Sequence, residues 1–118
     1  MIGLPSSVRI FLYATPIDLR KGFDGLAALV RAAGGDPFSG HLWVFLSRRA
    51  QHVKILTFDR GGFVVWFKRL ESGRFRFPSA TVAGSTFSLD AGQLALLLDG
   101  LDYALVARPP RWEPRRAA

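Results

Sequence analysis

The feature that most constrains the fold is a series of three apolar runs, rich in β-branched and aromatic residues, separated by very short connectors. The connectors are RRAQ and RGG, and the runs are HLWVFLS (41–47), HVKILTFD (52–59) and FVVWFKRL (63–70). Such residues favour strands, and connectors of this length join antiparallel neighbours as hairpins. Residues 41–70 are therefore predicted to form a three-stranded antiparallel meander.

Two further strands are predicted outside the meander. VRIFLY (8–13) is β-branched and aromatic and lies between Pro5 and Pro16, and STFSL (85–89) is a shorter candidate. With the three strands of the meander, they predict a sheet of about five strands, and residues 74–77 are a further short strand candidate that would pair with 63–70. The resulting sheet is mainly antiparallel.

Two helices are predicted from apolar residues at helical spacing. The first runs from about Leu19 to Ala33, with Asp18 as its N-cap, and Gly34 or Gly35 ends it. The second follows Asp90, which forms a capping-box pattern with Gln93. Its apolar stripe consists of Leu94, Leu97, Leu98 and Leu101.

These elements predict a single α+β domain over residues 1–107, with both helices packed on one face of the sheet. Residues 108–118, RPPRWEPRRAA, are rich in proline and arginine and lack periodicity. They are predicted to form an extended, flexible basic tail.

Composition excludes several kinds of site. The chain has no cysteine and two histidines, which rules out disulfides and leaves too few nitrogen and sulfur ligands for a zinc site. We expect no metal, cofactor or small-molecule substrate. The first residues lack a signal-peptide pattern, and no apolar run reaches the length of a membrane span. A cytoplasmic location without membrane contact is expected.

The formal net charge is +7 and is unevenly distributed. Residues 48–76 carry eight basic and two acidic side chains, whereas residues 77–107 carry three acidic and no basic ones. A concentrated positive field attracts polyanions, with nucleic acid first and an acidic protein or membrane surface behind it.

FKRLESGRFRF (67–77) is predicted to be a basic β-hairpin. Residues 71–73 have the length and glycine placement of a three-residue turn, which pairs Lys68 with Arg76. Arg69 then lies on the apolar face, near its rim. The other face carries Trp66, Lys68, Arg74 and Arg76.

Like charges facing each other across strands are destabilising by about 0.2–1 kcal/mol, so stability alone does not account for this hairpin. Phosphate binding does, because arginine presents forked donors to phosphate oxygens. The alternative is an edge strand protected by its charges. The candidate nucleic-acid-binding residues are Arg74, Arg76 and Lys68, with Trp66 as a stacking residue and Arg69, Arg48, Arg49 and Lys54 as flanking contacts.

No catalytic constellation is found, and the chain is not expected to be an enzyme. Asp18 and Asp24 are assigned to helix capping and to the helix surface. His41 and His52 lie on apolar strands without a nucleophile or carboxylate at triad spacing.

Four stretches of the sequence are informative when they are taken together: DLRKGFDGL (18–26), DPFSGHLWVF (36–45), KRLESGRFRFP (68–78) and QLALLLDGLD (93–102). Together they resemble the TnpB accessory protein of the insertion sequence 66 transposon family, also described as Orf-two-like. This protein is distinct from the RNA-guided nuclease that shares the name TnpB. The resemblance covers about residues 1–105, and the tail lies outside it. Members often have Trp or Tyr in place of Phe58 and Trp in place of Phe77.

The resemblance implies a small protein encoded beside the transposase and a second accessory protein, needed for efficient transposition but lacking the transposase's catalytic carboxylates. The expected partners are DNA, bound nonspecifically or at transposon ends, together with the transposase and the co-encoded accessory protein. The alternative function is a protein-interaction adaptor that docks on these proteins without touching DNA. Its basis is a surplus of aromatic residues, which would expose Trp43, Phe63 or Phe67.

Overall fold

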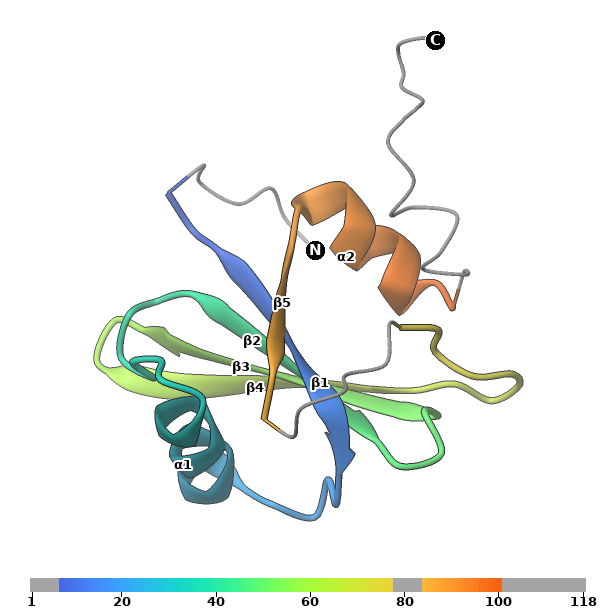
Figure 1. Cartoon of the computed structure of the whole chain (residues 1–118), viewed down its shortest axis with the longest axis horizontal. Coiled ribbons are helices and arrows are strands. Elements are labelled where there is room, and N and C mark those ends of the chain that lie inside the picture. Colours follow the sequence, from blue (N-terminus) through green and yellow to red (C-terminus); the bar gives the residue numbers. More distant parts are fainter. Residues whose placement is uncertain (1–6, 78–83, 101–118) are drawn as a thin grey trace, which may run out of the picture.

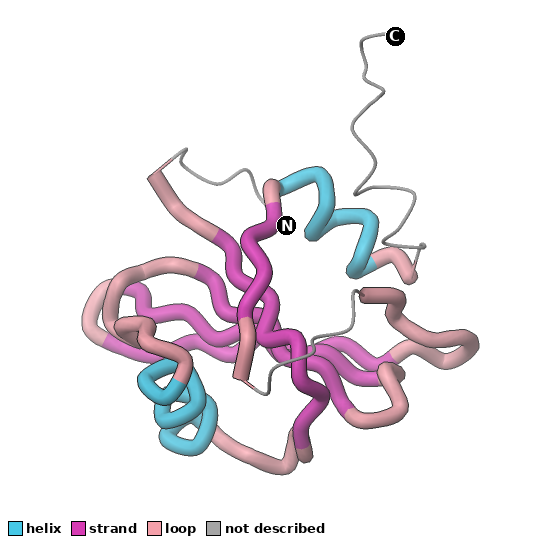
Figure 2. Tube along the Cα trace, in the orientation of Figure 1, coloured by secondary structure: helices cyan, strands magenta, loops and turns pink. Residues whose placement is uncertain are grey.

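A five-stranded sheet forms the centre of the computed structural model, which describes residues 7–77 and 84–100 (Figures 1 and 2). The strand order is β4-β3-β2-β1-β5. β1 and β2 are parallel, and every other neighbouring pair is antiparallel. The elements are β1 (Ile10–Ile17), α1 (Phe23–Ala32), β2 (Leu42–Ser47), β3 (His52–Asp59), β4 (Gly62–Arg69), β5 (Thr86–Leu89) and α2 (Ala91–Leu98).

The predicted α+β class, the mainly antiparallel five-stranded sheet and the meander of β2, β3 and β4 are confirmed. The strand predicted at 8–13 starts and ends later, and it continues through Pro16 to Ile17. The pairing of this strand with β2 shifts register between Tyr13 and Ile17. The shift accommodates Pro16, which has no N–H group to donate to the ladder. The tail predicted at 108–118 lies outside the described residues.

The two helices lie on opposite faces of the sheet, so the prediction that both pack on one face is wrong (Figure 1). α1 packs on Phe45 and Leu56, whereas α2 packs on Val44 and Ile55. Successive residues of a strand point to opposite faces, and β2 is buried on both, from Leu42 to Leu46. A strand that is apolar on both faces requires a cover on each side.

α1 begins at Phe23, later than predicted, and its N-cap is Gly22 without a side-chain cap. Asp18 is therefore not the N-cap. Its carboxylate instead accepts hydrogen bonds from the backbone and guanidinium of Arg20. This local pairing keeps residues 18–22 outside the helix, in the connection from β1.

α2 confirms the capping-box prediction. Asp90 accepts a hydrogen bond from the backbone N–H of Gln93, 2.7 Å, and Gln93 accepts one from the Asp90 N–H, 2.9 Å. The three leucines Leu94, Leu97 and Leu98 are buried, as predicted; Leu101 lies outside the described residues. α2 thus closes the face of the sheet that α1 leaves open.

Candidate nucleic-acid interface

Two backbone hydrogen bonds bring the basic segments together at one end of the sheet. Leu70 donates to the carbonyl of Gln51, 2.8 Å, and Phe75 donates to the carbonyl of Ala50, 2.6 Å. In Figure 1 the green turn between β2 and β3 and the yellow segment after β4 lie at the same end. We call the exposed arginines of these segments the basic end: Arg48, Arg49, Arg69, Arg74 and Arg76.

Phe75 anchors the basic end by packing in the hydrophobic core. Its side chain is 2% exposed and belongs to the cluster that α2 covers. The exposed Arg74 and Arg76 lie on either side of it in the chain. Burial of one aromatic ring therefore fixes where two cations emerge, even though this segment has no regular secondary structure.

The predicted β-hairpin over 67–77 is wrong. β4 ends at Arg69, residues 70–77 form no strand, and the pairing predicted for Lys68 with Arg76 does not exist. The expected left-handed glycine is present, since Gly73 has φ 79°. The chain leaves the sheet edge after β4 and Phe75 enters the core, where burial of a Phe side chain contributes about 1.5–3 kcal/mol.

The candidate residues on β3 and β4 are divided between the two faces. Trp66 and Lys68 face the α2 side, opposite Ile55 and Val53, whereas Phe67 and Arg69 face the α1 side, where Lys54 also lies. Arg69 was expected on this second face, and its exposed position there is confirmed. The single face of four residues expected from the hairpin is not formed.

The two candidate lysines, Lys54 and Lys68, both donate hydrogen bonds to backbone carbonyls. Lys68 Nζ donates to the Leu98 carbonyl, 2.7 Å, at the end of α2, where a cation also complements the helix dipole. Lys54 Nζ donates to the Lys21 carbonyl, 3.1 Å, and lies 5.5 Å from the centre of the Phe67 ring. Each therefore connects the sheet to a neighbouring segment.

Most of the charge of the basic end is unpaired within the described part of the chain. Residues 48–51 and 68–77 together contain six basic side chains and one acidic one, Glu71. Glu71 pairs with Arg69, 3.0 Å, in an exposed contact, the kind that contributes at most about 1 kcal/mol. The other four arginines of the basic end form no ion pair with a carboxylate of the described residues.

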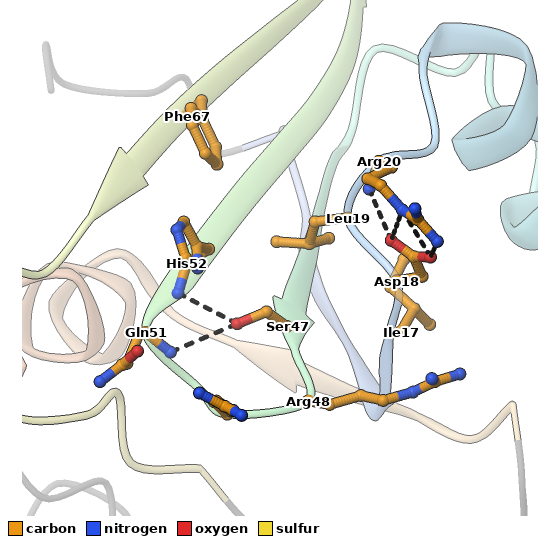
Figure 3. Close-up of a pocket in the computed structure, with 10 residues that line it drawn as sticks. Ile17, Asp18, Leu19, Arg20, Ser47, Arg48, Gln51, His52 and Phe67 are labelled. Atoms are coloured by element: carbon orange, nitrogen blue, oxygen red, sulfur yellow. Dashed lines mark hydrogen bonds and ion pairs between the residues drawn. The ribbon is translucent and has the colours of Figure 1, made fainter.

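A pocket of about 480 Å³ opens beside the basic end on the α1 side (Figure 3). Apolar side chains and cations share its lining. Ser47 belongs to the lining, and its Oγ accepts hydrogen bonds from the backbone N–H groups of Gln51, 3.3 Å, and His52, 3.1 Å. The lining residues are Ile17, Asp18, Leu19, Arg20, Ser47, Arg48, Arg49, Gln51, His52 and Phe67.

Asp18 is the acid of this pocket, and it is held in its charged form. The hydrogen bonds from Arg20, first from its guanidinium and then from its backbone N–H, keep the pKa of the Asp18 carboxyl well below its usual range. The charges of Arg20 and Arg48 act in the same direction. An ionised Asp18 reduces the positive charge on this side of the pocket, and Arg48 and Arg49 are lining cations that form no ion pair with the residues the structure describes.

Phe67 is a candidate stacking residue, a role that was not predicted for it from the sequence. It is 54% exposed, and its ring stacks on His52 at 5.8 Å with an interplanar angle of 7°. Trp66, the predicted stacking residue, is 40% exposed on the other face. Strand alternation was the available signal, because it places Phe67 and not Trp66 on the face of Arg69.

The aromatic residues expected at the surface behave differently from one another. Of the three candidates, Phe67 is exposed, whereas Phe63 is half-buried and Trp43 is buried. Within residues 7–77 and 84–100, no three side chains of His, Asp or Glu gather so that they could hold a metal ion. No helix in the same ranges is both long and apolar enough to cross a membrane.

Comparison with known proteins places the chain in a family. It is 35% identical over 119 residues to the uncharacterized protein y4jC of Sinorhizobium fredii, covering 100% of both chains. It is also 35% identical over 118 residues to y4hO of the same organism, covering 96% of this chain and 97% of that one. No solved structure matches. The model of the IS66 Orf2-like proteins matches residues 8–108, which confirms the resemblance, and the chain belongs to that family.

Proposed function

We propose that this protein is a non-catalytic accessory factor of transposition that binds DNA through phosphate contacts of the basic end. Family membership gives a transposition-associated accessory role. The observation that supports DNA as the ligand is the docking of residues 70–77 on the β2–β3 turn by the bonds Leu70–Gln51 and Phe75–Ala50. These bonds gather five arginines with one acid among them.

Phosphate contacts of this kind carry little sequence preference. Arginine forks bind phosphate oxygens, and such contacts position a protein on the duplex without reading its bases. Lys54, Lys68 and Trp66 contribute less in this proposal, because the two ammonium groups already bind carbonyls and Trp66 faces the α2 side. Transposon-end and unrelated DNA should therefore bind with similar affinity.

A salt titration on duplex DNA tests the proposal. Contacts to four to six phosphates make the logarithm of the affinity fall with the logarithm of salt concentration at a slope of about −4 to −5. The measurement uses retardation or anisotropy assays on transposon-end DNA and on unrelated DNA of the same length. A slope close to zero, or no binding at low salt, would contradict it.

A second candidate function is docking on the transposase or its co-encoded partner. It is favoured by the exposed apolar side chains of β4, namely Val64, Trp66 and Phe67. Co-purification with the transposase that survives nuclease treatment and high salt would support this function. Loss of the complex under either condition would count against it.

A further inference from the structure

Strand β4 has no second neighbouring strand in the described part of the chain. It ends the strand order and is eight residues long, whereas β5 at the other edge has four. Three of the five large apolar side chains that are exposed among the described residues belong to it: Val64, Trp66 and Phe67. Its central stretch, 63–67, contains neither charge nor proline. Long apolar edges without such protection pair with further strands.

The hairpin register shows which backbone groups of β4 point away from β3. The bond from Leu70 N–H to the Gln51 carbonyl makes these two residues a hydrogen-bonded pair. Such pairs alternate with non-hydrogen-bonded pairs along an antiparallel ladder, and the ladder between β3 and β4 is continuous. The outward N–H and C=O groups therefore belong to the odd-numbered residues Phe63, Val65 and Phe67.

We propose that β4 pairs in antiparallel fashion with β4 of a second copy of this chain, about a two-fold axis at Val65. Phe63 then faces Phe67 of the other copy, Val64 faces Trp66, and the two Val65 residues face each other. Outward backbone groups meet outward backbone groups, which gives about six hydrogen bonds between the strands. Two five-stranded sheets join into one.

Charge placement favours a second copy in this register. Lys68 and Arg69 face Gly62 and Gly61 of the other copy, so no cation opposes a cation. An axis at Trp66 would set Lys68 against Val64, and an axis at Lys68 would bring like charges face to face, which is destabilising. The stretch 63–67 is thus complementary to itself, with apolar residues against apolar residues on both faces.

Single cysteines test the register, because the chain has none of its own. In Val65→Cys the two Cα atoms lie about 5.5 Å apart across the axis, within the span of a disulfide. In the matched Val64→Cys control the two positions are diagonal neighbours about 7–8 Å apart, which is too far. Mild oxidation should link Val65→Cys into a dimer and leave Val64→Cys unlinked. Efficient linking of Val64→Cys but not of Val65→Cys would overturn the register.

Sedimentation of the parent chain tests the pairing without any substitution. After nuclease treatment and in high salt, the parent should have twice the chain mass of 13.0 kDa. Val64→Lys/Trp66→Lys, which sets lysine against lysine at two places, should be monomeric. Phe23→Lys/Phe38→Lys adds the same charge at exposed sites outside β4 and should stay dimeric. A monomeric parent, or a dimer that the β4 variant leaves intact, would overturn the proposal.

Discussion

Contacts of individual residues determine the local structure at the basic end and at the end of α1. Phe75 leaves the sheet edge for the core and so fixes the exits of Arg74 and Arg76. At the other side, α1 ends in a reversal in which Gly34 adopts φ 85° and Gly35 comes against the Trp43 ring. Such contacts depend on tertiary packing, which explains why composition and periodicity do not reveal them.

Substitution Gly35→Ala should lower the free energy of unfolding by about 1–3 kcal/mol. A Cβ atom at this position would overlap Cη2 of the Trp43 ring, and Trp43 is buried and stacked on Phe11. Urea titration measures the change. Gly62→Ala is the control, since its Cβ would meet nothing within 4 Å; equal stability of the two variants would contradict the packing explanation.

Asp18 should make stability depend on acid pH. Its pKa is depressed in the folded chain by Arg20, so its contribution is present above the unfolded value of about 3.9 and is lost as pH falls below it. Asp18→Asn should flatten the decline of the urea midpoint between about pH 5 and pH 2. Asp24→Asn, whose carboxylate forms no ion pair with the described residues, should retain the parent's slope. Identical slopes for Asp18→Asn and the parent would disprove the linkage.

At the scale of the elements, the sequence predicted what local patterns determine. The meander follows from its short connectors, and α2 follows from the capping box at Asp90. The parallel pairing of β1 with β2 was not predicted, because it depends on α1 as a crossover. The double-sided apolar pattern of β2 was the available signal that the helices lie on opposite faces.

Lys68 joins two elements, and its main role is expected to be structural. Lys68→Met keeps the aliphatic stem but removes the hydrogen bond to the Leu98 carbonyl at the end of α2, which should cost about 1 kcal/mol of unfolding free energy. Lys21→Met is the matched control, because Lys21 is exposed and its ammonium makes no hydrogen bond to the described residues. Equal urea midpoints for the two variants would show that the bond does not stabilise α2.

At the scale of the whole molecule, the sequence predicted the charge polarity but not its geometry. The basic residues were expected on one face of a hairpin, whereas five arginines from two segments lie at one end of the sheet. Hydrogen bonds between residues 19 and 25 positions apart in the chain create this arrangement, and no local pattern encodes them. The family assignment covers residues 8–108 and so includes every residue of the basic end.

The most direct test of the central claim is the DNA affinity of Arg74→Glu/Arg76→Glu. Its control is Arg31→Glu/Arg60→Glu, which changes the net charge equally at exposed arginines outside the basic end. If the basic end binds phosphates, the first variant should lose at least about tenfold in affinity and flatten the salt slope by about 2, while the control stays within a few-fold of the parent. Equal losses in two variants that remain folded would contradict the account.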